Sequence, residues 1–252
     1  MALERNLSSG LLIISVGVVL STAIAARSWV SVRLHRDHSI DATGSAKRRI
    51  VSDLIEWQGT ITTEDKDRTT AFRAVKQHMT RTLAYLKKAG IADNELEVGA
   101  VATEQQIETE YQGSGETRIE KKVFKGYKIT QTVLIKSKDV PKVDRVSREV
   151  TQLMDDGVPI TSDAPAYYYT QLSGLKVEML AEAARDCRQR AERILQYAGG
   201  ATLGKLRRAD MGVININAAN STEISSEGNN DTTSLEKDIL TIVHCAFDLE
   251  RG

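Results

Sequence analysis

The feature that most constrains this chain is an apolar run near its N-terminus, GLLIISVGVVLSTAIAARSWVSV at residues 10–32. Residues 11–26 contain no charged side chain, whereas the chain from residue 35 onward is charged and amphipathic. A helix that spans the hydrocarbon core of a bilayer needs about 20 predominantly apolar residues, because each adds about 1.5 Å. The sequence therefore predicts a short tail at 1–9, a membrane-directed segment at 10–32 and one soluble module after it.

The apolar run fits two kinds of segment. As a transmembrane anchor, it places Arg27 near its outer end, where a long side chain can reach the headgroups, and Trp29 at the interface. As a cleavable signal peptide, it has an apolar region at 11–20 and small residues suited to cleavage at 23–25. We favour the retained anchor because of its length and its interfacial tryptophan.

The positive charges around this segment bear on its orientation. Arg5 precedes the run, whereas Arg27, Arg33 and Arg36 lie at its end or follow it. Taken alone, the positive-inside rule would leave the soluble module in the cytoplasm.

The overall charge argues against nucleic acid as a partner. The chain has 34 Lys and Arg against 34 Asp and Glu, and its aromatic content is 5%. A balanced charge provides no basic field for a phosphate backbone, and few aromatic side chains provide little surface for base stacking.

Apolar periodicity predicts an alternation of helices and strands after residue 38. Helices are expected at 66–89, 139–154 and 175–198, and strands at 48–62, 95–111, 117–136, 203–217 and 235–249. Gly126 interrupts the third of these strands and suggests a β-bulge. The polar, Asn-rich segment 217–234 is typical of a mobile loop. The apolar stripe is expected at Phe72, Val75, Met79, Leu83 and Leu86 in the first helix and at Leu180, Ala184, Cys187, Ala191, Ile194 and Ala198 in the third.

Three consecutive tyrosines, Tyr167, Tyr168 and Tyr169, lie in a short extended stretch at 159–172. One interpretation is sheet packing with the hydroxyl groups at the rim. The other is a patch that stacks on a ligand or a partner, because tyrosine is enriched at interfaces.

The two cysteines lie on apolar faces, Cys187 on the third helix and Cys245 on the last strand. Two buried free thiols are the interpretation we favour. A single disulfide from helix to sheet is the alternative, which an oxidising envelope would permit.

A search for catalytic patterns returns none. The four histidines and two cysteines have no zinc-site spacing, and there is no phosphate-binding glycine loop and no G-x-S-x-G elbow. We therefore expect no catalytic, cofactor-binding or metal-binding residues, and no enzyme.

Several passages carry a family resemblance. SIDATGSAKRRIVSDLIEWQGTIT, FKGYKITQTVLIKSKDVPKV, the alanine-rich helix that ends in Gly199 and Gly200, and LGKLRRADMGVININ resemble the SIMPL-domain family of bacterial envelope proteins. The resemblance spans about residues 38–249. It implies an α+β domain at 38–252, with three main helices packed on antiparallel sheet, which we divide into halves at 38–137 and 138–252.

The resemblance also implies where the protein acts and how it assembles. Members are periplasmic or membrane-anchored, some form ring- or cage-like homo-oligomers, and some are linked to oxidative-stress defence. Against the arginine distribution, we expect a single-pass inner-membrane protein with its soluble domain in the periplasm. A soluble periplasmic protein after cleavage near Ala25 is the alternative.

Together these observations predict a non-enzymatic, membrane-anchored envelope protein that self-assembles through its SIMPL domain without a cofactor. The alternative function is a periplasmic binding module for a small ligand or a peptide. That module would use the three tyrosines at 167–169 and the 217–234 loop.

Overall fold

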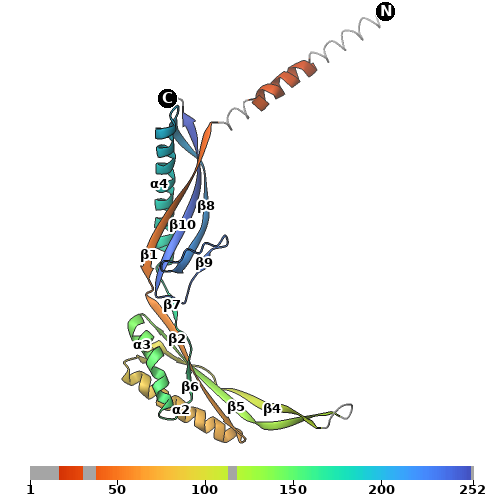
Figure 1. Cartoon of the computed structure of the whole chain (residues 1–252), viewed down its shortest axis with the longest axis vertical. Helices are drawn as coiled ribbons and strands as arrows, with labels where there is room; N and C mark the ends of the chain where they lie inside the picture. The colour runs from red at the N-terminus through yellow and green to blue at the C-terminus, as the bar shows by residue number, and fades with distance from the viewer. Residues whose placement is uncertain (1–16, 31–37, 113–117, 251–252) are drawn as a thin grey trace, which may run out of the picture. The chain divides into compact units, whose positions relative to one another are not determined.

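The computed structural model describes residues 17–30, 38–112 and 118–250, which fold as α+β with two sheets (Figure 1). The chain divides into two units. One comprises residues up to Lys47, Lys176–Ile214 and Leu240 onward, and the other comprises Arg48–Leu175 and Asn215–Ile239. The units interleave along the chain because long strands from its end pair with a strand from its start. They do not coincide with the predicted halves 38–137 and 138–252.

Residues 17–30 form an exposed helix, drawn in red in Figure 1. Among the described residues, no helix combines the length and the apolar character needed to cross a membrane. The tail at 1–9 and both ends of the predicted 10–32 segment lie outside the described residues. The membrane or signal segment therefore stays a prediction.

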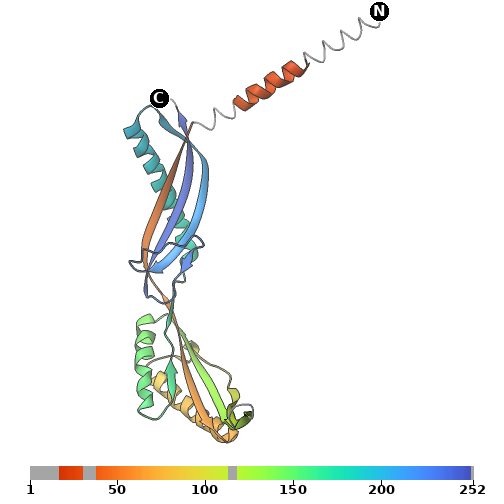
Figure 2. The same ribbon diagram turned by 45° about the vertical axis from the view of Figure 1, so that its right-hand side comes forward.

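In the first unit, helix α4 (Leu172–Ala198) runs along one face of a sheet, as Figure 2 shows. The sheet has the order β1 (Ser39–Val51), β10 (Glu236–Glu250), β8 (Thr202–Ala218) and β9 (Asn229–Asn230), of which β9 and one end of each longer strand are counted with the second unit. The short strand β9 pairs parallel with β8, so the expectation of purely antiparallel sheet is wrong at this edge.

The contact between α4 and β1 is made by small side chains. A Cβ atom on Gly44 would lie 2.1 Å from the carbonyl oxygen of Ala183 and 2.4 Å from the backbone nitrogen of Cys187. Only glycine permits so close an approach of two backbones. The buried small residues around this contact are Ala42 and Ala46 on β1 and Ala183, Cys187 and Ala191 on α4.

This close packing corrects the predicted stripe of α4. The buried positions recur every four residues, at Leu175, Met179, Ala183, Cys187 and Ala191. Ala184 is exposed, and Ile194 is 51% exposed. The prediction included both because it counted every apolar residue on a wide face of the helix, at steps of three, four and seven residues. A helix whose backbone touches a strand buries only the narrow line of side chains at the contact.

The second unit is built on a mainly antiparallel sheet with β2 (Leu54–Asp65) and β5 (Ile119–Ser137) at its centre. β3 (Leu96–Val98) and β4 (Ala102–Gln112) pair with β5, and β6 (Ile160–Ser162) and β7 (Ala166–Tyr168) pair with β2. Helices α2 (Arg68–Lys88) and α3 (Val140–Glu149) pack on this sheet, so three helices pack on sheet as expected. Two 3-10 helices, η1 (Asp93–Glu95) and η3 (Val150–Met154), complete it.

Helix α2 starts at an Asp67 cap, whose carboxylate accepts a hydrogen bond from the Thr70 amide at 2.8 Å. Its buried face consists of Ala71, Val75, Met79, Thr82 and Leu86. Phe72, expected on that face, is instead 44% exposed. Its neighbour Ala71 occupies the buried position one step back on the helix.

A hydrogen-bonded tryptophan joins three elements of the second core. Trp57 is 1% exposed, and its Nε1 donates to Ser162 Oγ at 2.9 Å. Ser162 Oγ in turn donates to the carbonyl oxygen of Ser147 at 2.6 Å. The indole therefore ties β2 to β6 and to α3 without an unsatisfied donor.

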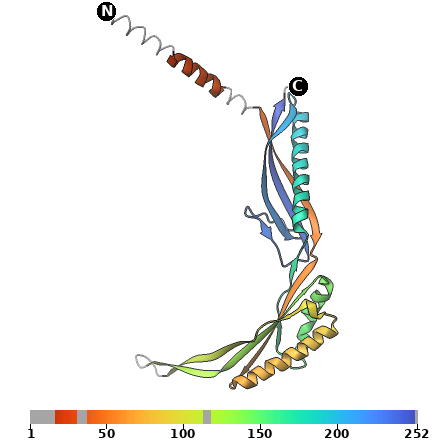
Figure 3. The ribbon, with the colours of Figure 1, turned by 180° about the vertical axis from the view of Figure 1, so that it is seen from behind.

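The predicted bulge at Gly126 is confirmed. The β4 and β5 register shifts between Gln106 and Ile107, opposite Gly126, whose φ is +150°. A Cβ at this position would lie 2.7 Å from the carbonyl oxygen of Asp65. Beyond the bulge, the β4–β5 hairpin leaves the part of the sheet that the helices cover (Figure 3).

The 217–234 segment is more ordered than the sequence predicted. Asn215 exchanges two hydrogen bonds with the Ser225 backbone, at 3.2 and 3.0 Å, and Asn229 donates to Asn217 Oδ1 at 2.7 Å. The side-chain amides of these asparagines thus form hydrogen bonds that a neighbouring strand would otherwise provide, which explains why the segment is rich in asparagine.

Candidate functional site

The three tyrosines of the 159–172 stretch are brought together, but each has a different environment. Tyr167 lies in β7 and is buried, with its backbone opposite Ile55 of β2. Its hydroxyl donates to Asp144 Oδ1 at 2.6 Å. Tyr168 and Tyr169 are half-buried.

Asp144 is the centre of this polar cluster. Arg148 donates to both of its carboxylate oxygens at 2.9 Å. Burial works to raise the pKa of the Asp144 carboxyl, but the hydrogen bonds from Tyr167 and Arg148 together lower that pKa below its ordinary value. Burial, and then the neighbouring Asp144 carboxylate, raise the pKa of the Tyr167 hydroxyl.

All three tyrosines line one pocket of about 60 Å³, together with Ile50, Leu172, Ile216, Asn230 and Lys237. Pockets for small organic ligands measure about 300–1,000 Å³. This one has room for a few water molecules. The tyrosines are therefore arranged for packing and hydrogen bonding, and not around a cavity of ligand size.

Sequence reasoning missed Lys237, which is 2% exposed beside the tyrosines. Its ammonium group donates to the carbonyl oxygens of Tyr167, at 2.7 Å, and Asp231. Burial lowers the pKa of this amine. The two-residue alternation of the last strand could have predicted that Lys237 is buried, because it places Lys237 on the same face as the buried Ile239.

Tyr167→Phe tests the tyrosine cluster. Removing the hydroxyl takes a hydrogen bond from a part-buried carboxylate, so we expect the pKa of Asp144 to rise toward its ordinary value and unfolding to cost about 1–3 kcal/mol less. Carboxyl-detected NMR titration and urea unfolding measure the two effects. Tyr169→Phe is the control, with no change in the Asp144 pKa expected. An unaltered Asp144 pKa in Tyr167→Phe would contradict the assignment.

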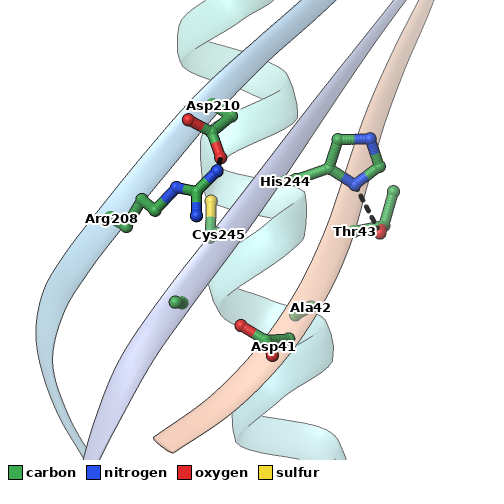
Figure 4. A pocket seen from close by; sticks show the side chains of 8 residues that line it. Asp41, Ala42, Thr43, Arg208, Asp210, His244 and Cys245 are labelled. Atoms are coloured by element: carbon green, nitrogen blue, oxygen red, sulfur yellow. Dashed lines mark hydrogen bonds and ion pairs between the residues drawn. The ribbon is translucent and has the colours of Figure 1, made fainter.

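A second cluster lines a cleft of about 240 Å³ in the first unit (Figure 4). Asp41 and Thr43 come from β1, His244 from β10, and Arg208 and Asp210 from β8. Arg208 and Asp210 form an ion pair at 2.5 Å, which raises the pKa of the guanidinium.

Thr43 and His244 are the nearest approach to a nucleophile and base in this cleft. Thr43 Oγ1 and His244 Nδ1 are 3.0 Å apart, which is within reach for proton transfer. Both side chains are exposed, and among the described residues no hydrogen bond orients the other ring nitrogen of His244. Within the same described part of the chain, no group of three His, Cys, Asp or Glu side chains could hold a metal ion. The contact is that of two solvated side chains.

Both cysteines are buried free thiols, Cys187 on α4 and Cys245 on β10. Cys187 Sγ donates to the carbonyl oxygen of Ala42 at 3.2 Å. Burial, reinforced by contact with Cys187, raises the pKa of the Cys245 thiol to about 12.

A comparison with protein families assigns this architecture. The model of a family described as SIMPL, protein of unknown function (DUF541), matches residues 40–239. The chain belongs to the SIMPL family. The matched SIMPL region includes residues of both units. It contains the whole tyrosine cluster and most of the second cluster, whose His244 lies beyond residue 239.

Comparisons with individual proteins add no function to this SIMPL domain. No curated protein matches the chain. Among solved structures, the de novo designed protein Foldit4 is 14% identical with a TM-score of 0.22, covering 44% of this chain and 93% of its own. A putative aminohydrolase from methicillin resistant Staphylococcus aureus is 11% identical with a TM-score of 0.21, covering 50% of this chain and 31% of its own. At these TM-scores neither likeness supports an inference.

The SIMPL domain presents apolar side chains on the β4–β5 hairpin. Its exposed large residues are Ile107 and Tyr111 on β4 and Ile119 and Phe124 on β5. Among the described strands, β4 pairs only with β5, so its other edge is unpaired. An unpaired edge with exposed apolar side chains is a site for strand addition.

The same unit has an open groove of about 550 Å³ between α2 and η3. Its floor is apolar, with Tyr85, Leu153 and Val158, and Arg81 and Lys88 provide positive charge. We refer to it as the α2–η3 groove. Its volume is in the range of a binding site, and its lining also includes Asp156, whose carbonyl oxygen accepts a hydrogen bond from Arg81 at 3.4 Å.

Proposed function

We propose that this SIMPL protein is a non-enzymatic, membrane-anchored envelope protein that assembles with copies of itself through its SIMPL domain. The observation that supports self-assembly best is the unpaired edge of β4, together with the exposed apolar side chains of its hairpin. A role in envelope or oxidative-stress defence rests on the family resemblance alone.

The β4 edge has only part of the usual protection against pairing, namely three glutamates and one bulge. Natural edge strands are commonly shielded by lysine, by proline or by a covering loop. The 11 residues of β4 include neither lysine nor proline. Only the bulge beside Ile107 interrupts its register with β5. A second chain can therefore hydrogen-bond to a long stretch of this edge.

Apolar character, more than charge, indicates which surface of a second copy receives the hairpin. β4 contains Glu104, Glu108 and Glu110 and no basic residue, but Lys125 of β5 forms ion pairs with Glu108 at 3.1 Å and with Glu110 at 2.8 Å. Helix α2 has the opposite composition, with no acidic residue and the exposed basic residues Arg68, Arg73, Lys76, Arg81, Lys87 and Lys88. The hairpin of one copy thus complements the α2–η3 groove of another mainly in apolar character.

A contact between two different surfaces has a consequence for assembly. When each copy uses both its hairpin and its groove, the contact is head-to-tail. If the rotation from one copy to the next adds up to a full circle, the copies form a closed ring. This mode agrees with the ring- or cage-like oligomers that the family resemblance implies.

The apolar segment at 10–32 supports the proposed anchor. Its length suits a single membrane span, and the resemblance places the SIMPL domain in the periplasm at the inner membrane. Release as a soluble periplasmic protein by cleavage near Ala25 is the alternative. The partners we propose are the membrane, through residues 10–32, and further copies of the chain, whereas its balanced charge gives no support to nucleic acid.

Ile107→Lys tests self-assembly. A lysine on the edge strand opposes pairing, so we expect dissociation into monomers at protein concentrations at least about tenfold higher than for the unaltered protein. Mass measurement in mild detergent over a concentration series gives this result.

Val177→Lys is the matched control. Val177 is an apolar residue of α4 that is 68% exposed, so the substitution introduces the same charge away from the hairpin. We expect its assembly to equal that of the unaltered protein. A strictly monomeric unaltered protein at micromolar concentration would refute the proposed function, as would equal effects of both variants.

A further inference from the structure

The two cysteines lie closer together than their separation in the chain suggests. Thr43 Oγ1 contacts His244 Nδ1 at 3.0 Å, and the Leu249 amide donates to the His38 carbonyl at 2.8 Å. In these two contacts the later residue of β1 lies beside the earlier residue of β10, so the two strands are antiparallel. Ala42 precedes Thr43 by one residue, and Cys245 follows His244 by one residue. In an antiparallel pair, Ala42 therefore lies beside Cys245.

Helix α4 places its thiol over this strand pair. Cys187 Sγ is 3.2 Å from the Ala42 carbonyl oxygen and 3.8 Å from the Val243 carbonyl oxygen, so it lies over the part of β10 that carries Cys245. The missing side chain of Gly44 brings the helix backbone down onto the sheet. A disulfide requires Cα atoms about 4.4–6.8 Å apart, which only such a close approach of helix and strand provides.

We propose that Cys187 and Cys245 close into a disulfide that ties helix α4 to strand β10 when the chain folds in the presence of a disulfide oxidant. Both cysteines are buried where α4 packs on β1 and β10. The chain has two cysteines, so no other pairing within one molecule competes.

The bond forms by two exchange steps. The thiolate of one cysteine attacks a sulfur of glutathione disulfide, whose S–S bond breaks to give a mixed disulfide and one glutathione thiolate. The second cysteine thiolate attacks the protein sulfur of that mixed disulfide, forms the bond between Cys187 and Cys245, and releases the second glutathione. The protein loses two protons and two electrons, and two reduced glutathiones carry them.

Burial determines when this reaction is fast. In the folded protein the pKa of Cys245 is about 12, against about 8.5 for an ordinary thiol, so its thiolate is scarce. Both sulfurs are also almost completely buried. The exchange therefore occurs before α4 has packed on the sheet, and packing then shields the bond from reductant.

Refolding of the full chain tests the proposal. The reduced protein is unfolded in urea, then refolded in mild detergent with a mixture of oxidised and reduced glutathione. Remaining thiols are alkylated under denaturing conditions and the digest is analysed by mass spectrometry. We expect a peptide that joins Cys187 to Cys245 in most chains, and a urea midpoint that falls when reductant is added. Reduced protein that is already folded should form the bond at least about tenfold more slowly.

Single-cysteine variants provide the control. Cys187→Ala and Cys245→Ala each keep one thiol, so refolding should leave that thiol free or bound to glutathione, with no effect of reductant on the urea midpoint. Two alkylated thiols in the refolded unaltered protein would overturn the proposal, and so would a midpoint that reductant leaves unchanged. Neither result bears on self-assembly, which the hairpin variants test separately.

Discussion

Gly44→Ala is expected to destabilise the first unit by at least about 3 kcal/mol, because overpacking against rigid backbone exceeds the usual cost of an added methyl group. The added Cβ would lie 2.1 Å from the Ala183 carbonyl oxygen and 2.4 Å from the Cys187 backbone nitrogen. Backbone atoms inside a helix cannot rotate away as a side chain can. Helix α4 would have to lift from β1 and expose the apolar seam that it buries.

Gly174→Ala is the matched control for this prediction. Gly174 lies in α4, and a Cβ there would meet nothing within 4 Å. Glycine to alanine in an open helical position usually raises stability by about 0.4–1 kcal/mol. Urea unfolding followed by circular dichroism compares the two variants. A loss below about 1 kcal/mol for Gly44→Ala would show that α4 can shift cheaply and that close backbone packing is not required.

Trp57→Ala is expected to destabilise the second unit by about 3–5 kcal/mol, the usual cost of removing a large aromatic side chain from a packed core. Trp57 is almost completely buried, and its ring packs over Gly59. The substitution leaves a cavity at the centre of the sheet. It also removes the donor to Ser162 Oγ.

Two further variants separate packing from hydrogen bonding at this tryptophan. Ser162→Ala removes the acceptor and should cost about 1–3 kcal/mol, since the indole N–H then lies buried without a partner. Trp57→Phe keeps most of the volume and should fall between the other two. The expected order of loss in urea unfolding is Trp57→Ala, Trp57→Phe, Ser162→Ala. A Ser162→Ala loss equal to that of Trp57→Ala would assign the stability to the hydrogen bond.

Local periodicity in the sequence was enough to place most elements. The alternation around Trp57 predicted β2, and the three- and four-residue steps after residue 66 predicted α2 with ends close to those observed. Gly126 predicted the bulge in β5, because glycine inside a strand marks a distorted register. The apolar phases of α4 and β10 also predicted that both cysteines are buried.

The parts that sequence reasoning missed depend on contacts between distant residues. Ile194 has the spacing of a buried residue but is 51% exposed. How closely α4 approaches β1, and so which of its residues are buried, is determined by Gly44, about 150 positions earlier in the chain. Lys237 is buried because two carbonyl oxygens, one of them from Tyr167, satisfy its ammonium group. Neither partner is visible in the local sequence around the residue.

The sequence by itself determined the α+β class, the approximate positions of most helices and strands, and the buried phase of many of their residues, because these follow from periodicities of 2 and 3.6 residues within one segment. Only the tertiary structure decided which strands are neighbours, how closely α4 approaches β1, and that Cys187 lies over the strand that carries Cys245. These features depend on the register between segments far apart in the chain. Many registers keep the same faces buried, and the detailed fit of side chains and glycines selects one.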